Sequence, residues 1–221
     1  MEVSATVAGV FGRALLLAVA AGLPITFLLR QISPRMVLRK VTQLRVPANE
    51  IARSFETLRN RMAIPGAQLR LSATKVPISF AVDADRPIVV MSECLISLLR
   101  KDELEAVMAH ELAHIKNSDT SLKALVTAYK TALPHDPMIR LVEAAFHRER
   151  EMVADETAAK ATGKPLSLAS ALLKIYEAFP EKNLRCYGPL SILGAGNSLM
   201  SRQPPLRARI NQLISLSKTQ L

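Results

Sequence analysis

The sequence predicts a mostly helical α+β protein with a small β-sheet, preceded by one hydrophobic N-terminal helix. Apolar residues recur with helical spacing in five stretches: residues 49–62, 102–116, 136–162, 166–179 and 206–216. Three short apolar runs between the first two of these are predicted strands: residues 69–71, 76–82 and 87–91. With 221 residues the chain is long enough for one well-buried core, and two full domains would be cramped.

The N-terminal residues 3–29 are almost wholly apolar, with Arg13 as the single charged side chain. A run of this length can cross a bilayer as a helix, and Pro24 would kink that helix without excluding it. We therefore predict a transmembrane helix within residues 1–30. A buried first helix of a soluble domain is an alternative. A cleaved signal peptide is another, although it usually begins with basic residues and residue 2 is Glu2.

Basic side chains directly follow the apolar run: Arg30, Arg35, Arg39 and Lys40. This excess of positive charge predicts that the rest of the chain lies on the cytoplasmic face of the cell membrane. Residues 31–48 are then a basic juxtamembrane linker, which would meet anionic lipid headgroups. Residues 49–221 are predicted to form one folded domain.

The formal net charge of +10 does not by itself indicate a nucleic-acid-binding protein. The Lys and Arg residues are scattered, aromatic residues are few, and no nucleic-acid-binding motif is present. Cys94 and Cys186 have no Cys-x-x-Cys spacing and suggest no disulfide framework, which fits a reducing compartment. We expect membrane lipid as a partner and no nucleic acid.

Residues 110–114 read His-Glu-Leu-Ala-His, and the functional prediction starts from this motif. In a helix, His110 and His114 would lie one turn apart on one face, where two neutral imidazoles can bind one Zn²⁺. Glu111 would project from a neighbouring face, where it could act on a metal-bound water. The alternative is a buried helix whose histidines only form hydrogen bonds with their neighbours.

The surrounding residues favour a helix. Residues 102–116 contain no glycine or proline, and Asp102 followed by Glu105 predicts a capping box at the start. Lys116 and Asn117 predict the end of this helix. One buried stripe is predicted along it: Leu104, Val107, Met108, Leu112 and Ile115.

The predicted helix 136–162 offers a third metal ligand. Glu151 and Asp155 are four residues apart, so their carboxylates would share one face. Glu151 could reach the metal, and Asp155 could accept the outer N–H of a ligand histidine, which fixes the tautomer of that ring. The alternative for both acids is a solvated helix face with ion pairs to Arg148 and Arg150.

Taken together, these motifs resemble the M48 metallopeptidases, the group of the bacterial heat-shock membrane protease and the CAAX-prenyl endopeptidase. The resemblance spans roughly residues 77–213 and is carried by three segments: residues 102–119 around the histidines, residues 150–159 around the third ligand, and residues 203–210. The last segment is similar to the family's His-Pro-x-x-x-x-Arg-Ile signature.

The resemblance implies a zincin-like (gluzincin) metallopeptidase domain at residues 49–221, with one Zn²⁺ per chain. It also implies that Arg209, the arginine of the signature, braces the site near an oxyanion; an arginine on the helix surface is the open alternative. Gln203 stands where the signature has histidine, and glutamine cannot carry a proton charge. Residues 78–80 read Ile-Ser-Phe where family members often have Asn-Ala-Phe, so substrate contacts are expected to differ there.

The predicted function is that of a membrane-anchored zinc metalloendopeptidase, a hydrolase of protein or peptide substrates that uses a metal-activated water. Glu111 would take the proton of the water and deliver it to the leaving amine. The resemblance implies a role in quality control of membrane proteins. Two alternatives stay open, a zinc-binding but non-hydrolytic regulatory or scaffold protein at the membrane and a basic peripheral module without metal. The oligomeric state is left undetermined.

Three further segments bear on the site. A strand beside the active-site helix could pair with extended substrate backbone, and residues 76–82 and 87–91 are both candidates. Residues 181–201 are loop-rich, contain three glycines, and could form a flap. His135 and His147 could touch the metal, although a structural role is commoner for such histidines.

Overall fold

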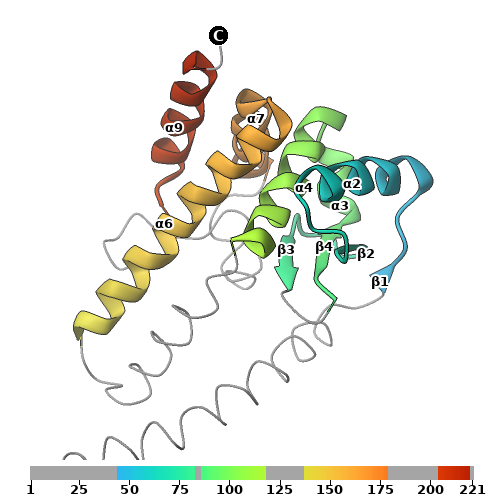
Figure 1. The fold of residues 1–221 in the computed structure, drawn as a ribbon, viewed down its shortest axis with the longest axis horizontal. Coiled ribbons are helices and arrows are strands. Elements are labelled where there is room, and N and C mark those ends of the chain that lie inside the picture. The colour runs from blue at the N-terminus through green and yellow to red at the C-terminus, as the bar shows by residue number, and fades with distance from the viewer. Residues whose placement is uncertain (1–43, 83–85, 118–136, 179–203, 220–221) are drawn as a thin grey trace, which may run out of the picture.

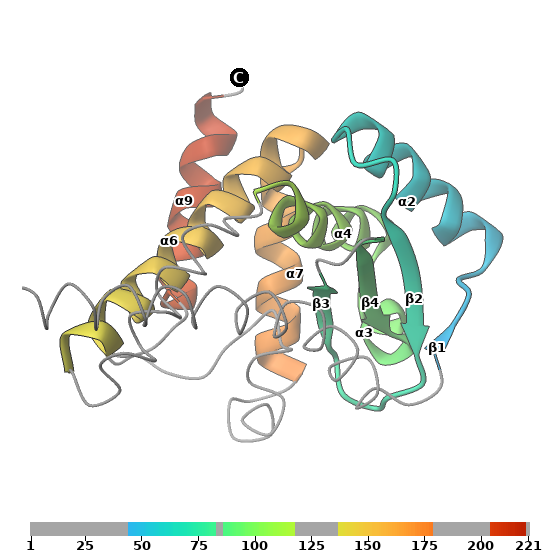
Figure 2. The ribbon, with the colours of Figure 1, turned by 60° about the horizontal axis from the view of Figure 1, so that its bottom comes forward.

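The computed structural model describes residues 44–82, 86–117, 137–178 and 204–219. Its elements, in chain order, are β1 (Leu44–Arg45), α2 (Asn49–Arg61), β2 (Gln68–Ser72), β3 (Ser79–Val82), β4 (Ile88–Ser92), α3 (Glu93–Leu98), α4 (Lys101–Lys116), α6 (Pro137–Thr162), α7 (Pro165–Ala178) and α9 (Leu206–Thr219). The strands gather on one side of the molecule, α6, α7 and α9 lie on the other, and α4 runs between them (Figure 1, Figure 2). The mostly helical α+β class is therefore confirmed.

Several predicted features lie outside the described residues. They are the hydrophobic helix within residues 1–30, most of the linker at 31–48, the loop-rich segment 181–201, and the side chains of His135, Cys186 and Gln203. Among the described residues, no helix is both long enough and apolar enough to cross a membrane.

The sheet has the strand order β1-β2-β4-β3. β2 and β4 run parallel, whereas β1 pairs with β2 and β3 pairs with β4 in the antiparallel sense. In β3, Phe80 and Val82 belong to a small apolar cluster on the outer face, while Ala81 packs on the main core. Residues alternate between faces along a strand, so Ser79 and Ala81 face the helices. Among the strands that the structure describes, β4 is paired on both sides and β3 lies at the edge.

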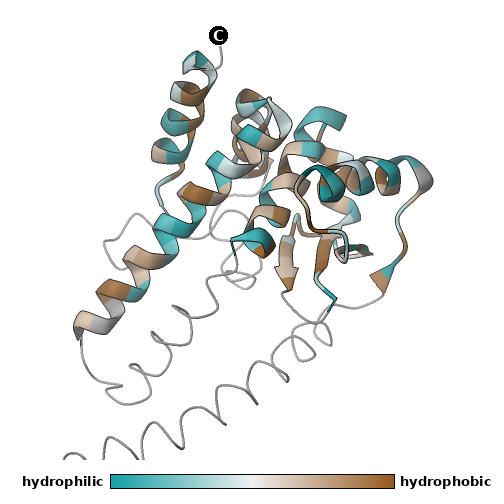
Figure 3. Cartoon of the chain, in the orientation of Figure 1, coloured by the Kyte–Doolittle hydropathy of each residue, from teal (hydrophilic) through white to brown (hydrophobic). Residues whose placement is uncertain are grey.

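α4 is the central helix of the fold. It packs against α2, α6, α7 and β3, and its residues are buried on almost every side. The predicted stripe is confirmed as buried, and small residues bury the remaining surface: Ala106, Ala109 and Ala113. Small side chains let neighbouring helices approach closely, so α4 sits deeper than the stripe predicted. In Figure 3 the strands are mostly hydrophobic, whereas α2 and α9 alternate hydrophilic and hydrophobic residues.

The start of α4 corrects one prediction. The helix begins at Lys101, and its capping carboxylate is that of Glu103, whose Oε2 accepts a hydrogen bond from the backbone N–H of Arg100 at 2.8 Å. Asp102, predicted as the cap, lies in the first turn and accepts a hydrogen bond from Ser167 of α7 at 2.9 Å. The capping residue differs from the prediction because α7 provides a hydrogen-bond donor to each carboxylate, Ser167 for Asp102 and Ser170 for Glu103.

Other predicted boundaries hold to within a few residues. Ser92 caps α3, since its Oγ accepts a hydrogen bond from the N–H of Leu95 at 3.1 Å. Gly163 ends α6 with a positive φ of 68°, a conformation that costs glycine little. The N-terminal part of α6 projects beyond the other elements (Figure 1) and exposes apolar side chains there: Met138, Leu141 and Val142.

Candidate metal centre

The two histidines of the motif lie on the face of α4 that meets α6. The Nε2 atoms of His110 and His114 are 3.1 Å apart, as expected for side chains one helical turn apart. His110 is buried, whereas the side chain of His114 retains 19% of its accessible surface. The helix therefore places the Nε2 atom of the buried His110 next to the Nε2 atom of the partly exposed His114.

Glu151 of α6 faces both rings. Its Oε2 lies 3.5 Å from Nε2 of His110, and its Oε1 lies 3.4 Å from Nε2 of His114. One ligand atom from each residue can be chosen so that all three atoms lie within 4.8 Å of one another. The structure thus brings together the three predicted metal ligands, although more than thirty residues of sequence separate His114 from Glu151.

The spacing of these donors fits a small divalent ion. Zn²⁺ binds imidazole nitrogen and carboxylate oxygen at about 2.1 Å, so two ligands of a tetrahedral ion lie about 3.4 Å apart. The two Nε2 atoms are 3.1 Å apart, and each ring has one of the two Glu151 oxygens at 3.4 or 3.5 Å, which is close to that value. Two imidazoles with one carboxylate are a donor set that zinc commonly takes.

Asp155 lies one turn beyond Glu151, behind His110. Its Oδ1 is 2.9 Å from Nδ1 of His110, and its side chain is fully buried. The N–H direction of the ring is not aligned with that oxygen, so the contact is an ion-pair approach with imperfect hydrogen-bond geometry. The carboxylate still lies where it can select the tautomer that leaves Nε2 free for a metal.

Arg209 of α9 holds Asp155 from the other side. Its Nε and one terminal nitrogen donate to the two carboxylate oxygens of Asp155 at 2.6 and 2.7 Å, a bidentate arrangement. Its other terminal nitrogen lies 3.5 Å from Oε2 of Glu151. The side chain is only 1% exposed, so the alternative of a surface arginine is wrong. Its described partners are acids of the site, and a contact with an oxyanion stays a prediction.

The charges of this cluster shift the acid–base equilibria of its members. Burial opposes ionisation of Asp155, but the charge and hydrogen bonds of Arg209 outweigh it and lower the pKa of Asp155. Burial likewise opposes ionisation of Glu151, and the neighbouring His114, His110 and Arg209 hold its pKa well below the ordinary value. Both acids are therefore carboxylates at neutral pH.

His110 is affected in the opposite sense. Burial lowers the pKa of His110, yet the polar contacts with Asp155 and Glu151 and the charge of Asp155 outweigh burial and raise this pKa to about 9 in the metal-free protein. Because a metal ligand must be deprotonated, a metal ion has to displace this proton.

Glu111 lies one residue after His110 and is 3% exposed. Ser79, at the start of β3, donates a hydrogen bond from Oγ to Oε1 of Glu111 at 2.5 Å. The sequence indicated residues 78–80 as a departure from the family and as part of a candidate substrate-binding strand, but it did not indicate Ser79 as a partner of Glu111. The sequence feature that could have indicated this contact is a serine on the buried face of a predicted strand, where an apolar residue is usual.

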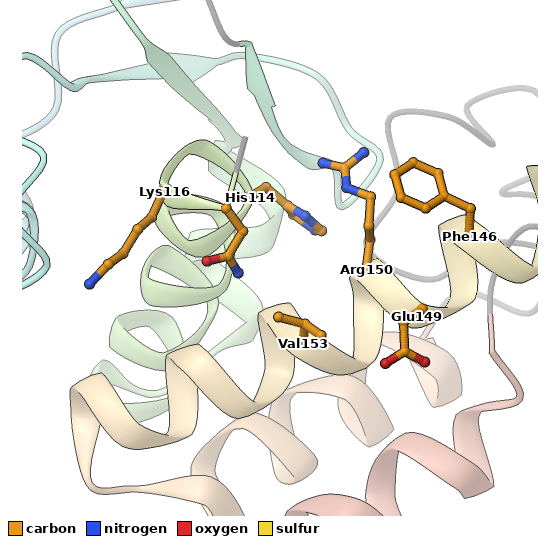
Figure 4. A pocket seen from close by; sticks show the side chains of 7 residues that line it. His114, Lys116, Phe146, Glu149, Arg150 and Val153 are labelled. Carbon is orange, nitrogen blue, oxygen red and sulfur yellow. The ribbon is translucent and has the colours of Figure 1, made fainter. Parts of the chain in front are cut away.

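A pocket of about 480 Å³ opens beside His114, between the end of α4 and the middle of α6 (Figure 4). Its lining is mixed in character: Lys116, Asn117, Phe146, Glu149, Arg150 and Val153. The guanidinium of Arg150 lies 5.8 Å from the ring centre of Phe146, a cation–π contact on the pocket wall. The partly exposed ring of His114 thus borders a space large enough for a substrate side chain.

Two other candidate residues do not belong to the converging group. His147, one turn before Glu151 on α6, is not among the three side chains that converge. Cys94 lies on α3, and burial raises the pKa of its thiol, which disfavours the nucleophilic thiolate.

Comparison with known proteins agrees with this geometry. Residues 3–192 match the family described as BlaR1 peptidase M56. A protease HtpX homolog of Pyrococcus furiosus is 31% identical over 210 residues, covering 75% of this chain and 73% of the relative. A homolog of Pyrococcus abyssi is 32% identical with the same coverage. The chain belongs to the related HtpX and BlaR1 families of peptidases.

A further relative and one solved structure are similar to most of this chain. A protease HtpX homolog of Gemmatimonas aurantiaca is 28% identical over 231 residues, covering 84% of this chain and 83% of the relative. The crystal structure of S. mikatae Ste24p matches with a TM-score of 0.67 at 16% identity, covering 86% of this chain and 56% of that one. The chain thus spans little more than half the length of Ste24p, and this likeness concerns the fold.

These findings bear on the predicted family and activity. The resemblance to M48 peptidases is confirmed through the HtpX homologs, while the matched family, M56, is a related one of zincin type. The prediction of a protease is confirmed.

Proposed function

We propose that this peptidase is a zinc-dependent endopeptidase whose centre is formed by His110, His114 and Glu151. The convergence of two imidazole nitrogens and one carboxylate at separations of 3.1–3.5 Å carries the proposal. When bound there, Zn²⁺ would acidify a water molecule and polarise the carbonyl of the scissile peptide. One Zn²⁺ per chain is expected.

Glu111 is the general base and acid in this proposal. Its carboxylate lies on α4 directly beside His110, where it would take a proton from the attacking water and return it to the leaving amine. Asp155 orients the ring of His110, and Arg209 holds Asp155 in place. Each of these groups is buried, which strengthens their electrostatic interactions.

Substrate backbone would bind along β3. Of the two candidate strands, β4 is hydrogen-bonded on both sides, to β2 and β3, whereas β3 has a free edge among the residues that the structure describes. An extended peptide could add to this edge through backbone hydrogen bonds, a mode that depends little on side-chain identity. Ser79 of β3 touches Glu111, so a peptide on this edge would lie beside the general base.

We further propose that the apolar residues 1–30 anchor the enzyme in the cell membrane, with residues 31–48 as the juxtamembrane linker and residues 49–221 as the catalytic domain on the cytoplasmic side. The charge distribution around the apolar run supports this orientation. The sheet reaches back to Leu44, so the end of the linker would be tied to the domain. Membrane proteins awaiting degradation are the substrates that the family resemblance implies.

Cleavage of fluorescein-labelled β-casein by the purified full chain tests the central claim. We expect cleavage that a zinc chelator abolishes and added Zn²⁺ restores. Glu111→Gln should retain one zinc per chain, measured by elemental analysis, and lose activity by about three orders of magnitude or more. Glu105→Gln, on the same helix and paired with Lys164 at the surface, is the matched control and should stay active. Zinc without chelator-sensitive cleavage would favour the non-hydrolytic alternative.

A further inference from the structure

A buried serine contacts the general base. Ser79 is 2% exposed and Glu111 is 3% exposed, and the 2.5 Å between Ser79 Oγ and Glu111 Oε1 is typical of a hydroxyl donating to an ionised carboxylate. Among the described residues, Ser79 is the side chain that gives Glu111 a hydrogen bond. Figure 2 shows β3, which carries Ser79, beside α4.

The position of Ser79 in the strand makes this contact specific. Phe80 and Val82 point into the outer apolar cluster, so Ser79 and Ala81 face the helix layer. An apolar residue would be expected at such a site. A hydroxyl there without a partner would cost free energy, and Glu111 is the partner that satisfies it.

Ser92 provides a contrast within the same sheet. Its Oγ accepts hydrogen bonds from the backbone N–H groups of Ile78 and Leu95, both at 3.1 Å, which is a structural role. The backbone N–H of Ser92 also donates to the carbonyl oxygen of Ile78 at 2.9 Å. Two of these bonds hold the backbone of Ile78, the residue immediately before Ser79. The hydroxyl of Ser79 therefore starts from a fixed backbone position.

We propose that Ser79 is a positioning residue for catalysis, whose hydroxyl holds Oε1 of Glu111 so that the other carboxylate oxygen faces the attacking water. This inference rests on the proposed hydrolytic function of the site. A glutamate side chain has several rotamers, and fixing one oxygen removes most of that freedom before substrate binds. Ser79 also belongs to the strand proposed to bind substrate backbone, so the residue that holds the base lies on the substrate-binding strand.

Three substitutions test this role in the β-casein assay with the zinc-loaded full chain. Ser79→Ala removes the donor and should lower kcat about tenfold to a hundredfold with little change in KM, since misplacing a catalytic group costs about that much. Ser79→Thr keeps the hydroxyl and should recover most of the activity. Ser72→Ala removes a buried serine hydroxyl from β2, which β4 separates from β3, and should leave kcat within about twofold.

Two further readouts separate positioning from folding. Zinc content and zinc affinity should be equal in wild type and Ser79→Ala, because Ser79 touches no proposed ligand. The thermal midpoints of Ser79→Ala, Glu111→Ala and the double variant should be non-additive, which reports the pair independently of activity.

The possible failures are distinguishable. If wild type shows no chelator-sensitive cleavage, the hydrolytic function fails and the role of Ser79 falls with it. If wild type is active and Ser79→Ala has an unchanged kcat, or if the thermal shifts simply add, the role of Ser79 alone is overturned. A Ser79→Thr variant as impaired as Ser79→Ala would also overturn it, provided that its thermal midpoint matches wild type.

Discussion

The two histidines of the motif occupy different surroundings, although only one helical turn separates them. His110 is on the inner side, where Asp155 lies 2.9 Å from its Nδ1 and Arg209 binds Asp155 through two hydrogen bonds. His114 is on the outer side, partly exposed and next to the pocket.

A catalytic metal centre needs firmly held ligands and also space for substrate, and the two sides of this centre meet these needs separately. The inner side is a closed network of charges that fixes one ligand ring before a metal arrives. The outer side leaves room for a substrate and for solvent beside the other ring. Burial of a charge is costly unless partners compensate it, so we expect the inner side to be sensitive to substitution and the outer side to be tolerant.

The largest effect is expected from breaking the inner side. Asp155→Ala leaves the buried guanidinium of Arg209 without its main partner, which should cost about 3–5 kcal/mol in the free energy of unfolding. Zinc affinity, measured against a competing chelator, should fall about 10- to 100-fold. Glu156→Ala is the control, because its ion pair with Lys160 is exposed and should be worth at most about 1 kcal/mol. Equal losses in both variants would contradict the comparison.

A smaller effect is expected when the charge of the inner side is kept and only its geometry changes. Arg209→Lys retains a cation but cannot form the bidentate pair with Asp155, so we expect a loss of about 2 kcal/mol in denaturant unfolding. Arg207→Lys, at an exposed position on the same helix, should change stability by less than about 0.5 kcal/mol. A tolerated Arg209→Lys would mean that charge alone holds Asp155.

Glu103 is a second buried carboxylate with compensating partners, so it tests whether such networks are sensitive to substitution elsewhere in the molecule. Burial would raise the pKa of Glu103, but Lys174, the Arg100 N–H and Ser170 bind its charged form and lower that pKa below 4.5. Stability from these contacts is therefore present above about pH 4.5 and lost as pH falls through the folded pKa. Glu103→Gln should cost about 1–2 kcal/mol at pH 7 and flatten the acid limb of the stability profile. An unchanged acid limb would exclude this network as its cause.

The smallest effect is expected on the outer side. Lys116 is exposed on the rim of the pocket, so Lys116→Gln should change the free energy of unfolding by less than about 0.5 kcal/mol and zinc affinity by less than about twofold. Thermal unfolding and chelator competition measure both quantities. A loss comparable to that of Asp155→Ala would show that the two sides do not differ.

The local parts of the site were predictable from sequence. Helical periodicity placed α4 and α6 within one residue of their observed bounds, and Gly163 marked the end of α6. The spacing of four residues put His110 with His114, and Glu151 with Asp155, on shared faces. Such features depend on neighbouring residues in sequence, so pattern and propensity suffice to find them.

Contacts between distant segments were less accessible. The family resemblance singled out Arg209, but its bidentate pairing with Asp155 depends on how α9 packs against α6. Ser79 was not recognised as a partner of Glu111, because strand alternation tells which face a residue occupies and not which helical side chain lies opposite. The N-cap of α4 was misplaced for a related reason, since Ser167 and Ser170 of α7 decide which acids are held.

The dependence of the inner side on α9 has a consequence for biosynthesis. The ligands come from α4 and α6, but the guanidinium that holds Asp155 belongs to Arg209 of α9, which follows both helices in the chain. A nascent chain leaves the ribosome from its N-terminus, so α4 and α6 emerge before α9 can dock on them. The bracing of Asp155 would therefore be completed only after α9 has been synthesised and has docked.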